Sequence, residues 1–232
     1  MKLEQLAALN AERAARRAAV LVTPFAAGEQ RLVKAVEAAS DPLAEAIIER
    51  LRLGKSGVIE TESGGYFLTV QVPPVRLVVT GAVHISQALV PMARLLDLDV
   101  TVIDPRTAFA SPERFPDVRL LAEWPEEALK DMPFDRYTAF AALTHDPKID
   151  DPALVAALRS DAFYVGALGS RKTHAKRLDR LKAQGLSDAD VARIKAPIGL
   201  PIGAVSPAEI ALAILGEVVA ALRLDAPRER AS

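Results

Sequence analysis

The sequence predicts an α/β protein in which helices cover both faces of a parallel sheet, preceded by a smaller α+β unit. From Val75 onward, short β-rich runs alternate with helical patterns, as in parallel strands joined by crossover helices. The residues before them show a different order, with two helices and a hairpin. Because Val72-Pro-Pro74 interrupts both patterns, we place a domain boundary there. The predicted units are residues 1–74 and 75–232.

The second unit is expected to contain five strands and six helical segments. The strands are expected at residues 76–80, 100–103, 118–121, 137–143 and 163–165. The helices are expected at 86–96, at 125–130, after an N-cap at Asp151 with Pro152 at the first helical position, at 171–184, after the capping box 187–190, and at 207–222. The last helix is almost wholly apolar and should be largely buried. In helix 171–184, the apolar residues Ala175, Leu178 and Leu181 form one stripe opposite a basic face.

The first unit reads as helices over residues 3–19 and 42–53, followed by a hairpin. Its strands, 58–59 and 66–72, flank the turn Glu62-Ser-Gly-Gly65. The Pro/Gly-rich loop 197–203 in the second unit cannot be helical throughout.

Composition restricts the function classes. The 232 residues include no cysteine, which excludes disulfides, thiolate metal sites and thiol nucleophiles within this chain. A net charge of −1 argues against nucleic-acid binding, so any binding charge must be local. We find neither a secretory signal nor a membrane-spanning stretch and expect a soluble cytoplasmic protein.

The turn after the first strand resembles a dinucleotide-binding turn that has lost two glycines. Gly81 is present, and Asp104 follows 23 residues later, a spacing that suits a carboxylate reaching a ribose hydroxyl. Val83 and Ser86 occupy the other two glycine positions, and Val83 should obstruct a pyrophosphate. The turn therefore indicates either a nicotinamide- or flavin-dependent oxidoreductase or a sheet with an altered nucleotide site.

The turn after the fifth strand is the stronger anion-binding candidate. Glycines and free amides at a helix start would cradle an anion together with basic and hydroxyl side chains. The members are Gly166, Gly169, Ser170, Arg171, Lys172 and Thr173, and Lys176, Arg177, Arg180 and Lys182 extend the charge along the helix. The alternative is a solvated basic helix face.

All three histidines follow strands of the predicted sheet. His84, His145 and His174 come after strands one, four and five, where open parallel sheets bind ligands. Their spacing matches no metal site. Asp146 beside His145 could contact the ligand as well, and Arg106 could either contact it or pair with an acid.

These residues together resemble the XdhC/CoxI family of xanthine dehydrogenase accessory proteins. The resemblance rests on Gly81-Ala82 with His84, on the segments 104–106, 144–147, 150–154 and 164–177, and on 196–200 running into 206–215. It implies a Rossmann-like domain that binds molybdopterin, the molybdenum cofactor, alone or in its dinucleotide form. The implied function is a chaperone without catalytic residues of its own, which serves a molybdenum hydroxylase of the xanthine dehydrogenase type after a cysteine desulfurase supplies sulfur. The implied cofactor-binding residues are Gly81, His84, Asp104, Arg106, His145, Asp146, Gly166, Gly169, Ser170, Arg171, Lys172 and His174.

Two departures from the family pattern refine this expectation. Family members generally have glycine where this chain has Val83, which shifts the expected phosphate site to the strand-five turn. Many members also have an N-terminal cysteine that this chain lacks, so sulfur would come from a partner's persulfide. Two alternatives stay open: the oxidoreductase, and a scaffold that docks molybdoenzyme and desulfurase without binding cofactor. We also expect a homo-oligomer, because apolar helical stretches of the first unit could pack between subunits.

Overall fold

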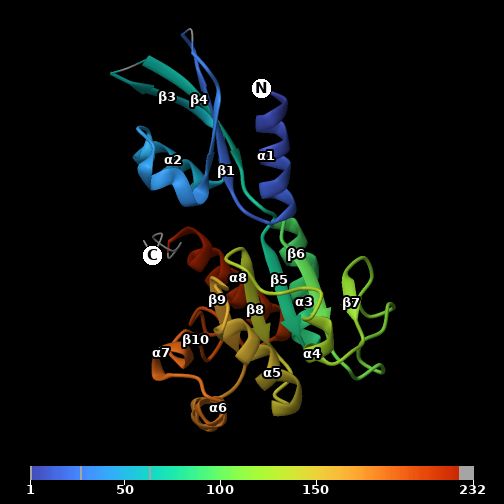
Figure 1. Cartoon of the computed structure of the whole chain (residues 1–232). Coiled ribbons are helices and arrows are strands. Elements are labelled where there is room, and N and C mark those ends of the chain that lie inside the picture. The colour runs from blue at the N-terminus through green and yellow to red at the C-terminus, as the bar shows by residue number, and fades with distance from the viewer. Residues whose placement is uncertain (1, 27, 63, 225–232) are drawn as a thin grey trace. The chain divides into compact units, whose positions relative to one another are not determined.

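The computed structural model describes residues 2–26, 28–62 and 64–224, which form two compact units, Met1–Pro73 and Pro74–Ser232 (Figure 1). The first unit is built on a four-stranded antiparallel sheet with the order β2-β1-β4-β3. Its elements are α1 (Leu3–Ala14), β1 (Ala19–Pro24), β2 (Arg31–Lys34), the 3-10 helix η1 (Ala35–Ser40), α2 (Ala44–Leu53), β3 (Gly57–Thr61) and β4 (Gly64–Gln71).

The predicted hairpin is only half of this sheet. The expected helix over residues 3–19 was too long, because the chain leaves the helix after Ala14 and Arg16 takes a positive φ of 52°. Ala19 then starts β1, one of the two inner strands, which pairs with both β2 and β4. The apolar run of β1 has no period-2 alternation, which explains why the sequence pattern missed it. Ser63, in the expected turn, lies outside the described residues.

The second unit contains a six-stranded parallel sheet with the order β10-β9-β8-β5-β6-β7. This is the doubly wound order of dinucleotide-binding folds, with the reversal of strand order between β5 and β8. The strands are β5 (Arg76–Thr80), β6 (Asp99–Ile103), β7 (Arg119–Leu121), β8 (Thr138–Ala142), β9 (Tyr164–Ala167) and β10 (Ile194–Lys195). The helices are α3 (His84–Leu95), α4 (Pro125–Ala128), α5 (Pro147–Leu158), α6 (Arg171–Ala183), α7 (Asp188–Val191) and α8 (Pro207–Arg223).

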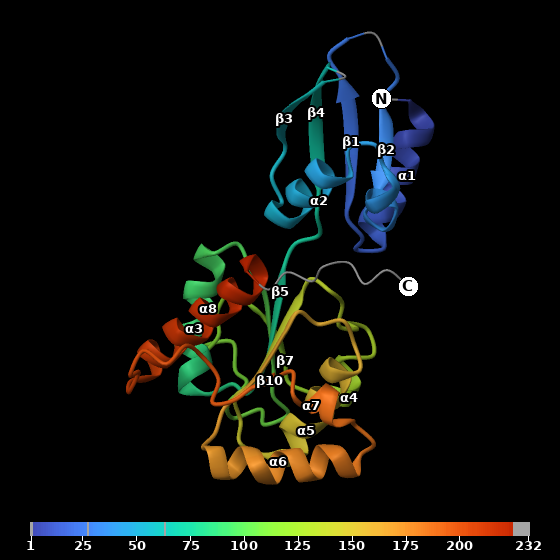
Figure 2. The same ribbon diagram turned by 90° about the vertical axis from the view of Figure 1, so that its left-hand side faces the viewer.

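Two hydrophobic layers sandwich this sheet. Leu77 and Val79 of β5 face one layer, which contains Leu89 of α3 and Ile214 of α8, while Val78 faces the layer beneath α4, α5 and α6. Such alternation on a strand buried on both sides is typical of parallel sheets. Figure 2 shows the two helix layers on opposite sides of the sheet, with α6 lying across its lower end. The sheet therefore presents its carboxyl ends toward α6.

Three predictions for this unit were wrong in detail. The sixth strand, β10, was missed because two residues carry no recognisable pattern. Helix α5 begins at Pro147 with Asp146 as its N-cap, so Asp151 and Pro152 lie inside the helix. Helix α8 buries only one face, and Leu212 on the other face is 58% exposed. No helix in the described parts of the chain is long and apolar enough to cross a membrane.

Gly166 was predicted to contact a ligand, but its position in the sheet indicates a role in packing. It lies within β9, and a Cβ there would come within 2.6 Å of Ile198 and of the Tyr164 hydroxyl. We expect Gly166→Ala to lower the free energy of unfolding by about 1–3 kcal/mol through overpacking. Urea denaturation followed by circular dichroism measures the change.

Gly216→Ala is the matched control, because the added Cβ meets only the flexible end of Leu200. A helix-interior alanine should be neutral or stabilising there, by up to about 1 kcal/mol. Equal stabilities of the two variants would contradict the packing role of Gly166.

Candidate functional site

The turn after β5 has its first amides occupied by the protein itself. The Ala82 amide donates to Asp104 Oδ2 at 2.8 Å, and the Val83 amide donates to Ser86 Oγ at 2.8 Å. Ser86 in turn donates to the Gly81 carbonyl at 2.6 Å, and it does so from the position of the third glycine in a dinucleotide turn. Two amides that a pyrophosphate would need are thus already used.

Both carboxylate oxygens of Asp104 also accept hydrogen bonds from the protein itself. Its carboxylate is fully buried and accepts two hydrogen bonds from the Arg106 guanidinium, at 2.9 and 2.8 Å. Burial alone would raise the pKa of Asp104, but the hydrogen bonds from Arg106 and Ala82 outweigh it and leave the pKa lowered. Arg106 also stacks over Phe109, 4.6 Å from the ring centroid. The carboxylate expected to bind a ribose instead holds its own turn together.

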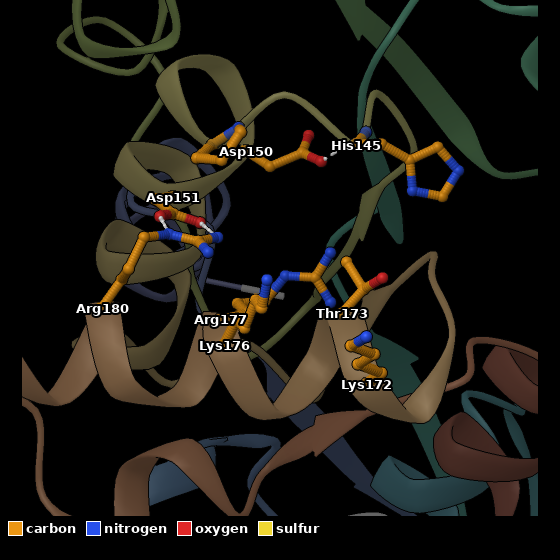
Figure 3. A pocket seen from close by; sticks show the side chains of 9 residues that line it. His145, Asp150, Asp151, Lys172, Thr173, Lys176, Arg177 and Arg180 are labelled. Carbon is orange, nitrogen blue, oxygen red and sulfur yellow. Dashed lines mark hydrogen bonds and ion pairs between the residues drawn. The ribbon is translucent and has the colours of Figure 1, made fainter.

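A cavity of about 290 Å³ lies between α5 and α6 (Figure 3). Its cationic side chains all come from α6, whereas its carboxylates come from α5. The lining residues are His145, Pro147, Asp150, Asp151, Lys172, Thr173, Lys176, Arg177 and Arg180. The cavity therefore combines the first turns of two helices with an excess of positive charge.

Asp150 shapes the α5 side of the cavity. It is buried and accepts hydrogen bonds from Thr80 Oγ1 at 2.8 Å and from the His145 amide at 3.1 Å. Burial raises the pKa of Asp150, and the hydrogen bonds from Thr80 and Thr144 offset only part of this effect. The same contacts hold His145 at a positive φ of 64° with its side chain exposed at the cavity edge.

Arg177 is the buried cation of the site. Its side chain is only 2% exposed, and one amino group, Nη2, donates to the Leu168 carbonyl at 2.8 Å. The Nε and Nη1 atoms are buried and have no hydrogen-bond partner. Burial lowers the pKa of Arg177, although the charges of Asp150 and Asp151 work in the opposite direction. Figure 3 shows the guanidinium directed from α6 toward the turn that carries His145.

The other charges of the cavity differ in how far they are neutralised. Arg180 binds Asp151 through two hydrogen bonds, at 2.6 and 3.0 Å, so this pair contributes little net charge. Lys172 and Lys176 form no ion pair with any residue in the described ranges, and both are exposed. Arg177 and these two lysines therefore give the cavity its positive potential.

The residues predicted from sequence fall into distinct places. Of the expected cofactor-binding residues, only His145 and Lys172 line the cavity. Asp146 and Ser170 are the N-caps of α5 and α6. The other residues lie beside the cavity, in a neighbouring turn or within a strand: Gly81, His84, Asp104, Arg106, Gly166, Gly169, Arg171 and His174.

Two of these outlying residues still bear on the site. Gly169 has a φ of +135°, and a Cβ there would lie 3.8 Å from Arg177 Nη2. His174 has a buried Nδ1 without a partner, and burial lowers the pKa of this histidine, with the charge of Arg177 adding to the effect. The three histidines do not gather, and the described residues contain no group of three side chains placed to bind a metal ion.

Sequence reasoning missed the acidic wall of the cavity. In the segment that leads into α5, Asp-Pro occurs twice, at 146–147 and 151–152, and choosing the second pair as the helix start hid both Asp150 and Asp151. The first pair carried the same N-cap and proline signal. On α6, Arg177 shares the buried face with Leu181, whereas its charge predicts a place on the basic face of the helix.

Comparisons with known proteins identify relatives of this chain. A family model described as the XdhC Rossmann domain matches residues 77–218. An uncharacterized protein of Escherichia coli (strain K12), YqeB, is 30% identical over 178 residues, covering 72% of this chain and 32% of that protein. The molybdenum cofactor insertion chaperone PaoD of the same organism is 33% identical over 152 residues, covering 66% and 41%. The chain thus spans less than half the length of either relative.

The fold also occurs in a solved structure. A crystal structure described as a xanthine dehydrogenase from Bacillus halodurans superposes with a TM-score of 0.67 over 99% of this chain and 66% of that one. At 20% identity, this likeness supports the fold alone.

The saturated Asp104 predicts a defined pH dependence of stability. A carboxylate whose pKa is lowered by folding stabilises the protein above its unfolded pKa of about 3.9, and this stabilisation is lost as the pH falls through the lower folded value. We expect Asp104→Asn to cost about 1–3 kcal/mol at pH 7. The difference from the unsubstituted protein should shrink below about pH 4. Urea unfolding at a series of pH values measures it.

Asp161→Asn is the control, because Asp161 is exposed. It should leave stability unchanged over the same pH range. A cost for Asp104→Asn that stays constant from neutral to acidic pH would contradict a role for the carboxylate charge.

Proposed function

This chain belongs to the XdhC family, and we propose that it binds the molybdenum cofactor and delivers it to a molybdenum hydroxylase of the xanthine dehydrogenase type. The observation that carries the proposal is the buried Arg177 guanidinium, whose Nε and Nη1 atoms lack acceptors at the edge of a cationic cavity. A buried donor without an acceptor is costly, and a bound anion would remove that cost. Molybdopterin carries such an anion, its phosphate.

The residues of the cavity fit a phosphate group. Lys172 and Lys176 supply exposed charges, while Arg177 supplies a buried planar donor. The starts of α5 and α6 add the positive ends of two helix dipoles. These residues would anchor the cofactor, whose molybdenum centre would provide the chemistry in the acceptor enzyme.

The chain itself offers no sulfur donor. It contains no cysteine, so a terminal sulfur on the cofactor would have to come from another protein. A cysteine desulfurase would supply it as a persulfide in our proposal. The relative named as a molybdenum cofactor insertion chaperone supports the insertion role.

The saturated first turn argues against the oxidoreductase alternative. NAD binding in a doubly wound sheet uses the first turn for the pyrophosphate and the carboxylate after the second strand for the ribose. Here the Ala82 amide donates to Asp104 and the Val83 amide donates to Ser86, while Asp104 is paired with Arg106. NAD therefore serves as the negative control ligand.

Lys172→Ala tests the site. We expect it to weaken molybdopterin binding about tenfold, because the variant removes one charge-assisted hydrogen bond to the phosphate. Anaerobic titration of the purified full chain, followed by fluorescence of the pterin, measures the dissociation constant.

Lys182→Ala is the control on the same helix, since Lys182 lies outside the cavity and is paired with Asp188. It should bind like the unsubstituted protein. Equal weakening by both variants would indicate a nonspecific charge effect of α6. No molybdopterin binding by the unsubstituted chain would favour the scaffold alternative, in which the basic helix contacts partner proteins.

A further inference from the structure

We propose that this site selects a phosphate monoester and discriminates against the dinucleotide form of the cofactor. The inference rests on the proposed function, because it assumes that the cavity between α5 and α6 is where the cofactor phosphate binds. In the pterin alone the phosphate is terminal. In the dinucleotide form it is part of a diphosphate that joins two larger groups.

The donors of the cavity match a terminal phosphate. Arg177 has one N–H at Nε and two at Nη1, and none of these has an acceptor in the protein. A monoester presents three terminal oxygens with a charge of about −1.5 to −2 at pH 7. Each phosphorus of a diphosphate diester has only two terminal oxygens and one negative charge. The monoester therefore gathers three acceptors and more charge on a single phosphorus, which one guanidinium can meet from one side, whereas the diphosphate spreads its charge over two.

The turn after β5, where a nucleotide would bind in this fold, has no free hydrogen-bond donors at Ala82 and Val83. In a doubly wound sheet, the nucleotide would bind at the turn after β5, near the reversal of strand order. In this chain the Ala82 and Val83 amides are taken, and Asp104 is buried with both oxygens bonded. A nucleotide placed there would have to break the pair that Asp104 forms with Arg106. Leaving one partner of such a pair unpaired is costly.

The size of the cavity agrees with one small ligand group. Its volume of about 290 Å³ lies just below the range of small-molecule sites, which span about 300–1,000 Å³. An added nucleotide would extend beyond it, where the neighbouring turn is already filled by Ser86 and Val83. The nucleotide would contribute few contacts there. The phosphate joined to it would also carry less charge than the terminal phosphate of the pterin.

The test compares the binding of molybdopterin and of its cytosine dinucleotide form to the purified full chain. Both dissociation constants are measured by the same anaerobic fluorescence titration. Inorganic phosphate and NAD serve as probes of the two phosphate types. We expect the dinucleotide to bind at least tenfold more weakly than the pterin, and phosphate to compete where NAD does not. Equal or tighter binding of the dinucleotide would overturn this inference and leave cofactor binding intact. Failure of both forms to bind would overturn the proposed function instead.

Two variants connect this selectivity to the donors. Arg177→Gln should weaken the pterin more than the dinucleotide and so reduce the ratio between them. Because Arg177 is buried and its replacement could unfold the unit, Lys176→Gln at the exposed entrance gives a second test. An unchanged ratio in a folded Lys176→Gln protein, with both forms weakened equally, would contradict selection by charge.

Discussion

A guanidinium buried at the carboxyl end of the sheet is the constraint around which this site is arranged. Removing a charge from water is costly unless it is paired. Arg177 is partly compensated by the nearby charges of Asp150 and Asp151 and by one bond to the Leu168 carbonyl. Other positive groups lie near this residue. They are the N-terminal ends of α5 and α6 and the exposed side chains of Lys172 and Lys176, which extend the positive charge toward solvent.

The turns after β5 and after β9 differ in how their hydrogen-bond donors are used. At the first turn, the protein supplies its own anion, Asp104, and the fold binds it with the amide and guanidinium that a ligand would otherwise meet. At the turn after β9, the protein leaves donors open. The same sheet thus has one turn whose donors are paired within the protein and another next to a buried guanidinium with two unpaired nitrogen atoms.

The sequence predicted the doubly wound unit well, because its strands are apolar and separated by helices with clear caps at Ser170, Ser187 and Ser206. It failed where the local signal is short or duplicated, as with the two-residue β10 and the repeated Asp-Pro that shifted the start of α5. The basic turn after β9 was recognised, but a buried arginine looks like a surface arginine in a sequence. Only the packing of α6 distinguishes Arg177 from its exposed neighbours.

The hydrogen bond between Arg177 and the Leu168 carbonyl links ligand occupancy to local order. The same guanidinium that faces the cavity also holds the backbone just before the glycine turn of α6. An anion that fixes the position of this guanidinium would therefore stiffen residues 168–173 without moving the sheet. A molecule with an anion bound there would differ from an empty one mainly in the rate at which these amides exchange with solvent.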